Sequence, residues 1–239
     1  MKNRILAVAG AFGLLTAFAN SQAFPVINEF VADHTGSDTN EFVEVFGSAN
    51  SDLSNYFVLE IEGDSTGAGV LDEIIQVGTT DAGGFWVTPY SAGMLENGTI
   101  TLLLVTDLSG VVVGLDLDVD NDGVFDVTPW TSIVDSVGVT DGGASDVNYS
   151  SVVLGPGYDG NSFRPGGASR IPNGVDTDTT ADWMRNDFDG EGFPGFTGTP
   201  DVGEALNTAG STNLAAVPEP ATMAALALGA IGLIRRRRS

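Results

Sequence analysis

The acidic run from Asp116 to Asp126 is the part of the sequence best suited to chemistry. Calcium prefers about six to eight hard oxygen ligands, and carboxylates at alternate positions of a tight loop can face one centre. Gly123 stands where such a loop needs a glycine for its sharp turn. The candidate metal ligands at alternate positions are Asp118, Asp120, Asp122, Val124 through its backbone carbonyl, and Asp126.

Two departures separate this loop from a complete EF-hand-type site. Pro129 occupies the position of the bidentate glutamate, and no helices are predicted on either side. The sequence therefore predicts a weaker calcium site in a β-loop, completed by Asp116, Asp135 or water. The alternative is a solvated Asp/Asn/Gly turn in a protein that is acidic throughout. A second acidic group, residues 176–178 with 187–191, is a lesser candidate of the same kind.

Catalytic chemistry has few residues to work with. The chain has no cysteine and one histidine, which excludes thiolate and histidine-rich zinc chemistry. We expect His34 to lie exposed in a loop and to form no serine-hydrolase triad. Hydrolysis of a glycosidic bond needs only two carboxyl groups, but Glu41 and Glu44 would face opposite sides of an alternating strand. We therefore expect a protein that is not an enzyme.

The charge of the chain limits its partners. It has nine basic and 32 acidic residues and a formal net charge of −23. Without the terminal segments 1–23 and 218–239, three arginines and 31 acidic residues remain, a net charge near −28 with no lysine. Such a surface repels nucleic-acid phosphates and attracts divalent cations. Schiff-base and P-loop chemistry are excluded because both need a lysine.

Residues 1–23 have the pattern of a secretory signal peptide. Lys2 and Arg4 form a positive start, and an uncharged, mostly apolar stretch follows. Small residues at the third and first positions before the expected cut place cleavage between Ala23 and Phe24. The sequence thus predicts a mature chain that acts outside the cytoplasm.

The C-terminal segment 218–239 has three parts: a Pro-Glu-Pro tripeptide, an uncharged apolar stretch over 221–234, and a basic tail over 235–238. The apolar stretch is shorter than the roughly 20 residues that span a bilayer, but arginine side chains can extend to the interface from a short span. This order resembles the PEP-CTERM sorting signal of bacterial exported proteins. The residues that carry the resemblance are Pro218, Glu219, Pro220, Arg235, Arg236, Arg237 and Arg238.

The resemblance implies a route of export and the partners that act along it. It implies export, transient insertion of the 221–234 segment into the inner membrane, and cleavage near the Pro-Glu-Pro by an exosortase, a membrane transpeptidase-like enzyme. It also implies a Gram-negative type of host that makes extracellular polysaccharide. The mature protein would then reside at the cell surface or outside the cell.

The central part of the chain reads as all-β. Short runs rich in valine, isoleucine and phenylalanine recur between clusters of glycine, aspartate, asparagine and serine. About nine short strands suggest a sandwich or an open barrel. The strands are expected at 26–31, 42–46, 56–61, 74–77, 85–88, 99–106, 111–115, 133–137 and 147–153.

Six short motifs in this region resemble the lamin-tail domain, an immunoglobulin-like β-sandwich. They lie at 27–30, 38–45, 52–56, 169–174, 182–183 and 198–200. Phe42 stands where that family usually has tryptophan, and Asn55-Tyr56 replace Gly-Trp. In the first motif Ile27 and Phe30 are expected in the core, with Asn28 and Glu29 at the surface or in a turn. The resemblance implies a fold that hosts many roles, so no function follows from it.

The resulting domain organisation is a signal peptide (1–23), a lamin-tail-like β-sandwich with long loops (24–206), a flexible linker (207–217) and the sorting segment (218–239) with its transmembrane helix. We expect a non-catalytic structural or interaction role at the cell surface or in the matrix, with calcium as a stabilising cofactor. The first alternative is a calcium-dependent carbohydrate-binding module that uses an exposed tryptophan. The second is a hydrolase of extracellular polymer.

Overall fold

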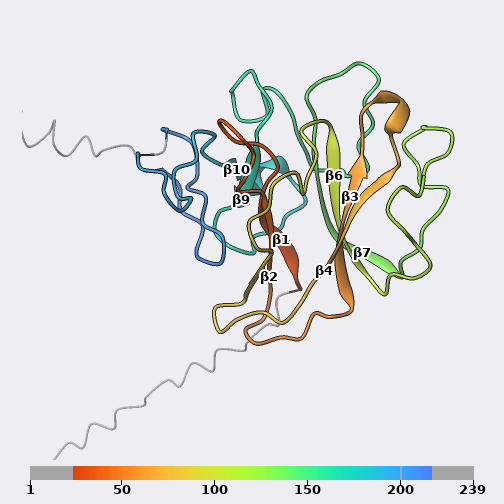
Figure 1. Ribbon diagram of the computed structural model, residues 1–239, viewed down its shortest axis with the longest axis horizontal. Helices are drawn as coiled ribbons and strands as arrows, with labels where there is room; N and C mark the ends of the chain where they lie inside the picture. Colours follow the sequence, from red (N-terminus) through yellow and green to blue (C-terminus); the bar gives the residue numbers. More distant parts are fainter. Residues whose placement is uncertain (1–23, 200, 217–239) are drawn as a thin grey trace, which may run out of the picture.

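The computed structural model describes residues 24–199 and 201–216, which form two five-stranded sheets packed face to face (Figure 1). The first sheet has the order β10-β9-β1-β2-β5 and the second the order β4-β3-β6-β7-β8. The strands are β1 (Val26–Val31), β2 (Phe42–Phe46), β3 (Tyr56–Glu62), β4 (Leu71–Gln76), β5 (Phe85–Val87), β6 (Ile100–Thr106), β7 (Ser132–Val139), β8 (Val153–Leu154), β9 (Gly167–Arg170) and β10 (Trp183–Arg185). This architecture confirms the all-β prediction and is consistent with a β-sandwich. The closer likeness to the lamin-tail domain stays a prediction.

Strand β6 shows why a continuous apolar run forms a strand here. Leu102 and Leu104 face the core between the sheets, whereas Leu103 and Val105 face a second apolar cluster. That cluster includes Leu117 of the long loop between β6 and β7, which covers the outer face of the second sheet. Because both faces of β6 are covered, residues 102–105 form a continuous apolar run instead of alternating with polar residues.

The prediction of a strand over 111–115 is wrong. The chain forms a loop there, and Val112 and Val113 are 70% and 55% exposed. Gly110 and Gly114 flank these valines with φ values of +70° and +87°, which break the extended backbone that a strand requires. Similarly, little of 147–153 is extended, and the short strand β8 begins only at its end.

Strands β9 and β10, which complete the first sheet, are absent from the predicted set of strands. Strand β9 pairs with β1 and β10 pairs with β9, both antiparallel. Their sequences, Gly-Ala-Ser-Arg and Trp-Met-Arg, lack the alternating apolar pattern that identifies a strand. They are fixed by long-range pairing with β1, which the local sequence does not reveal.

The prediction of Asn28 and Glu29 at the surface is also wrong, because both side chains are fully buried. Residues 204–216, here called the strap, return over the first sheet and hydrogen-bond to the side chain of Glu29 and to the backbone carbonyl of Asn28. The predicted flexible linker is therefore wrong for 207–216, which pack on the folded domain. Its buried asparagines, Asn207 and Asn213, are satisfied because their amide groups donate to backbone carbonyls of the domain.

Two short 3-10 helices, Ser65–Gly67 and Thr180–Asp182, occur between the strands. Within residues 24–199 and 201–216, no helix has the length and apolar character needed to cross a membrane. The predicted signal peptide, including Ala23 at its cleavage site, lies outside the described residues. The sorting segment from Pro218 to Arg238 also lies outside them.

Candidate functional site

The acidic loop is anchored on the outer face of the second sheet. Leu117 is fully buried, and its N–H donates to the carbonyl of Gly69 at 2.9 Å. Phe125 stacks on the ring of Tyr149 with a centroid separation of 4.5 Å. Gly69 permits this close approach, because a Cβ there would lie 2.7 Å from the Cβ of Asp118. These apolar anchors hold the carboxylates between them in one place.

The loop brings three of the predicted ligands together. One carboxylate oxygen from each of Asp118, Asp120 and Asp122 lies within 4.8 Å of the others. The turn that makes this possible passes through Asn121 and Gly123, with φ values of +56° and +87°. The spacing of the aspartates and the turn glycine thus agrees with the proximity of these three carboxylates, while a site that also uses Val124 and Asp126, and calcium binding itself, stay predictions.

Asp118 is the structural centre of this group. Its carboxylate accepts hydrogen bonds from the N–H of Asp122 (3.2 Å), the N–H of Gly123 (2.9 Å) and the hydroxyl of Tyr149 (2.7 Å). Burial raises the pKa of Asp118, but these hydrogen bonds together outweigh it and hold the pKa below its usual range. Asp118 is thus ionised, as a cation ligand must be.

Asp120 experiences the opposite effect. The charge of Asp122, followed by burial and the charge of Asp126, raises the pKa of Asp120 above its usual range. This is mutual repulsion between carboxylates, and a divalent cation placed among them would relieve it.

The other predicted ligands take different positions. Asp126 accepts the N–H of Val119 at 2.9 Å, and the N–H of Val124 donates to Asp122 at 2.9 Å. Asp116 accepts the N–H of Asp118 at 3.0 Å. The suggestion that Asp135 completes the site is wrong, because Asp135 lies on β7 and pairs with Arg170 at 2.9 Å.

The second predicted acidic group is not assembled. Asp176 pairs with Arg170 at 3.0 Å, whereas Asp187 accepts the N–H groups of Glu191 and Asp201. Among the described residues, these two segments contribute to no group of three or more carboxylates with oxygens within 4.8 Å of one another. Within the second segment, Asp187 and Glu191 form only a hydrogen-bonded pair.

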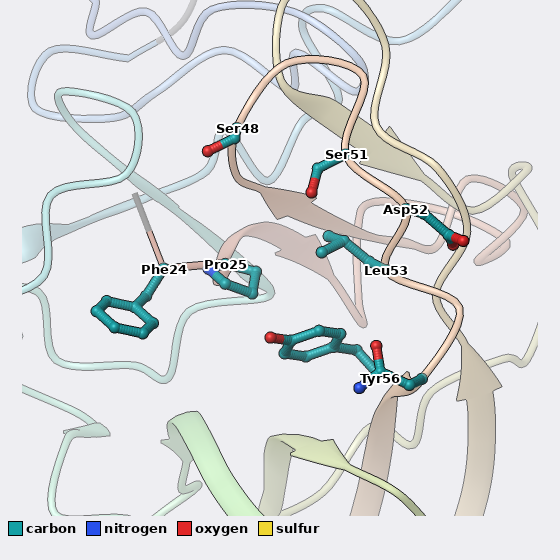
Figure 2. Close-up of a pocket in the computed structure, with 8 residues that line it drawn as sticks. Phe24, Pro25, Ser48, Ser51, Asp52, Leu53 and Tyr56 are labelled. Carbon is teal, nitrogen blue, oxygen red and sulfur yellow. The ribbon is translucent and has the colours of Figure 1, made fainter. Parts of the chain in front are cut away.

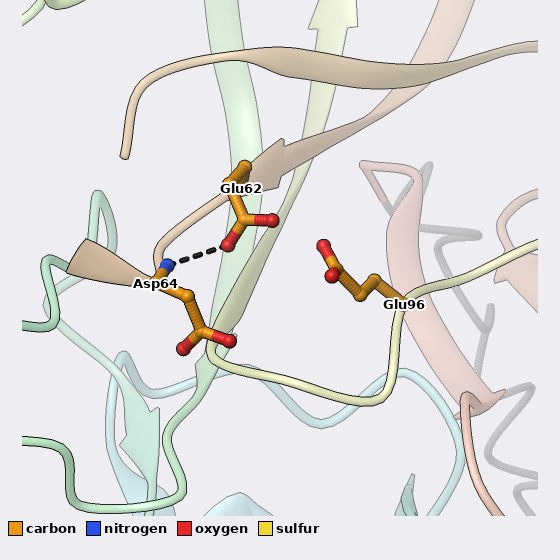
Figure 3. Close-up of side chains that lie close together, drawn as sticks. All are labelled: Glu62, Asp64 and Glu96. Atoms are coloured by element: carbon orange, nitrogen blue, oxygen red, sulfur yellow. Dashed lines mark hydrogen bonds between the residues drawn. The ribbon is translucent and has the colours of Figure 1, made fainter. Parts of the chain in front are cut away.

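The sequence analysis missed a group of acids at one end of the sandwich. Glu62, Asp64 and Glu96 bring their carboxylates within 4.8 Å of one another (Figure 3). A hydrogen bond with Glu62, reinforced by burial, raises the pKa of Glu96 to about 8, so these two side chains share a proton. Local spacing could not have revealed this group, because Glu96 comes from a segment about 30 residues beyond Glu62 and Asp64.

Two buried carboxylates hold the loop that carries Glu96. Glu41 accepts the successive N–H groups of residues 93–95, and Glu60 accepts the N–H of Glu96 at 2.6 Å. Glu44 binds elsewhere, at Asn28 and the strap. Glu41 and Glu44 thus hold different segments and do not form the acid pair of a glycosidase.

The prediction that His34 is exposed is wrong, because the residue is 2% exposed. Its Nε2 accepts the N–H groups of Thr39 and Asn40, both at 3.2 Å, and its Nδ1 lies 3.0 Å from the carbonyl of Thr35. The imidazole therefore holds the loop over residues 35–40. It is packed against the ring of Phe193 at 5.2 Å.

Residues 63–67 read Gly-Asp-Ser-Thr-Gly, a Gly-x-Ser-x-Gly match that the sequence analysis overlooked. Ser65 follows β3 with a φ of +47°, but a 3-10 turn takes the place of the α-helix of a nucleophile elbow. Within the described residues, Ser65 has no hydrogen bond to His34. The Gly-x-Ser-x-Gly pattern is therefore present, but His34 is not placed to act as a general base for Ser65.

All three arginines of the described chain are used in ion pairs. Arg170 contacts Asp135, and its guanidinium lies 4.4 Å from the ring centroid of Trp183. Arg185 pairs with Asp159, and Arg164 with Asp33. Among residues 24–199 and 201–216, no arginine is left free to bind an anionic ligand.

Comparison with known proteins gives one finding. Residues 216–238 match the family model described as the PEP-CTERM protein-sorting motif. No curated protein and no solved structure matches the chain. The motif indicates an exported surface protein that is targeted to an exosortase and passes through a membrane-anchored stage.

Proposed function

We propose that this protein is an exosortase-processed component of the cell surface or extracellular matrix with a structural or interaction role and no catalytic one. The observation that carries the proposal is the sorting motif, which directly follows a rigid acidic domain. Its histidine and arginines are occupied in holding loops and strands, which supports a non-catalytic role.

Mass spectrometry of surface fractions tests the sorting half of this proposal. Cells with an exosortase should release or display a chain that lacks the peptides beyond residue 221. A variant without Pro218, Glu219 and Pro220 should retain those peptides in the membrane fraction. Detection of the intact C-terminus in the mature surface protein would contradict the proposal.

We further propose that calcium stabilises the domain through Asp118, Asp120 and Asp122. The proximity of their oxygens and the repulsion at Asp120 support it. The loop backbone and water would supply the remaining ligands. Calcium should raise the melting temperature, and Asp120→Ala should remove most of that gain. The exposed Asp189, replaced by alanine, is the matched control and should keep it.

A second candidate function, carbohydrate binding, is favoured by one cavity of about 310 Å³ (Figure 2). The rings of Phe24, which is 83% exposed, and Tyr56 lie along it, and Ser48 and Ser51 face it from a neighbouring loop. Aromatic faces and hydroxyl groups are the surfaces that sugars use. Within the described residues, the hydroxyls of Tyr56, Ser48 and Ser51 make no hydrogen bond.

A glycan array distinguishes this candidate. Binding that is lost in Phe24→Ala or Tyr56→Ala, and kept in the exposed control Phe188→Ala, would support it. No exposed tryptophan is available for such contacts among the described residues, since Trp183 is 5% exposed and Trp86 and Trp130 are half-buried.

A further inference from the structure

The strap forms an extension of the first sheet beyond β10. The N–H of Ala205 donates to the carbonyl of Arg185, and the N–H of Asp187 donates to the carbonyl of Ala205, both at 2.8 Å. Ala205 also bridges to Ala215, so the strap folds back on itself as a hairpin-like pair (Figure 1). The strap thus has the backbone hydrogen bonds of a sheet edge.

Two buried glutamates fix the middle of the strap. Thr208 donates its N–H and its hydroxyl to the carboxylate of Glu29, each at 2.9 Å. Gly210 donates its N–H to Glu44 at 2.6 Å. Both glutamates come from the first sheet, on β1 and β2, so these bonds join the end of the domain to its beginning.

Asn213 fixes the last turn of the strap. Its amide donates to the carbonyls of Asn28 (3.1 Å) and Arg170 (3.0 Å), and its N–H donates to the Oδ1 of Asn173 (2.9 Å). The residue is 4% exposed. Asn213 thus makes three hydrogen bonds to the domain, two of them from its side chain.

The attachment reaches the sorting motif itself. Ala216, the first residue of the match, donates its N–H to the carbonyl of Glu204 at 2.7 Å. Pro218 follows two residues later, and two residues extend no more than about 7 Å. A peptidase needs several residues on each side of the cleaved bond in an extended and accessible form. Here Ala216 is paired with Glu204 inside the strap, and the strap as a whole is hydrogen-bonded to the domain.

We propose that the strap controls exosortase processing: residues 213–216 must separate from residues 204–206 and from the first sheet before the enzyme can engage the motif. The proposal rests on the proposed exosortase function. Strap attachment then sets how fast a folded, membrane-anchored precursor is released. Weakening the strap should accelerate processing, although no residue of the sorting motif changes.

The first test compares two alanine variants within the strap. Asn213→Ala removes the two side-chain bonds to the domain, whereas Ser211→Ala removes only a bond from Ser211 to Thr208 within the strap. Hydrogen exchange is measured on unprocessed full-length protein from a strain without exosortase. We expect Asn213→Ala to accelerate exchange over 204–216 by about tenfold or more, with β6 unchanged, and Ser211→Ala to resemble the wild type.

The second measurement is a pulse-chase of precursor processing in the host with exosortase. Asn213→Ala should be processed several times faster than the wild type and Ser211→Ala. A Gly-Ser-Gly-Ser spacer inserted after Ala216 places the motif beyond the reach of the strap. With the spacer, the wild-type and Asn213→Ala chains should be processed at the same, faster rate.

The outcomes separate the two proposals. If the wild type is not processed at all, even with the spacer, the exosortase function fails and the strap proposal fails with it. If processing occurs at equal rates in the wild type, Asn213→Ala and the spacer chain, the function stands and strap control is wrong. If Asn213→Ala leaves hydrogen exchange unchanged, the double variant Thr208→Ala/Asn213→Ala replaces it. Equal processing rates of the double variant and the wild type would then refute control of processing by the strap.

Discussion

Glu60 offers the sharpest test of how acid groups shape this fold. Its side chain is 2% exposed and accepts one hydrogen bond, from the N–H of Glu96. Burial raises the pKa of Glu60 most; the bond from Glu96 opposes this, and the charges of Asp72, Glu96 and Glu73 raise the pKa further, to about 8 from 4.5. The folded protein therefore carries a proton there at neutral pH.

The sign of the pH dependence follows directly. Between pH 4.5 and about 8 the folded state binds a proton at Glu60 that the unfolded state has lost. Stability is therefore full below pH 4.5 and falls as the pH rises toward 8. At about 1.4 kcal/mol per pH unit, this window corresponds to roughly 5 kcal/mol as an upper bound.

Glu60→Gln should remove this contribution. The amide oxygen can keep the bond from Glu96, and the amide N–H groups face Asp72 and Glu96 across a cavity of about 250 Å³. Urea unfolding at pH 5 and pH 8, with chelator present, should show the variant more stable than the wild type at pH 8 by a few kcal/mol. The difference should shrink or reverse at pH 5.

The half-buried Glu73, which pairs with Glu60 across β3 and β4, is the matched control. Glu73→Gln should leave most of the pH dependence in place. If wild type and Glu60→Gln lose the same free energy of unfolding between pH 5 and pH 8, the reasoning about Glu60 is refuted. Part of the dependence will persist, since burial also raises the pKa of Glu29 to about 7 and of Glu44 to about 8.

Three further predictions concern single contacts. Arg170→Met leaves Asp135 buried and unpaired, so it should cost about 3–5 kcal/mol in urea unfolding at pH 7; a loss below 1 kcal/mol would contradict this. Tyr149→Phe removes the hydroxyl bond to Asp118 and should cost about 1–2 kcal/mol and reduce any melting-temperature gain from calcium, as calorimetry can check. Leu103→Ala opens a cavity on the fully buried outer face of β6 and should cost about 2–5 kcal/mol by denaturant unfolding, whereas Leu214→Ala, at an exposed site, should be close to neutral.

The apolar strands were predicted well from the sequence because short runs of apolar residues indicate buried strands directly. Strands β1 and β2 have the predicted bounds, and β6 begins one residue later than expected. Strand β9 escaped prediction because its pairing with β1, across more than a hundred residues, leaves no periodic signal. The valines over 111–115 misled because the effect of two flanking glycines outweighed strand propensity.

The polar residues likewise fall into those that the local sequence could predict and those that it could not. Asp118, Asp120 and Asp122 could be predicted because one short loop contains them. Buried polar residues could not, since each partner lies far away in the sequence: Glu29 binds Thr208, and Asn28 binds Glu44 and Gly174. A polar side chain on a strand is assigned to the surface by default, and only the folded chain shows the partner that buries it.

The placement of the arginines also affects how long the protein can last outside the cell. Trypsin-like proteases cut after lysine or arginine, and residues 24–217 contain no lysine and three arginines. Arg170 and Arg185 are 1% exposed, and the side chain of Arg164 is 16% exposed and held by Asp33. The folded domain therefore presents almost nothing to that whole class of secreted enzymes, and digestion by them should report unfolding rather than surface access.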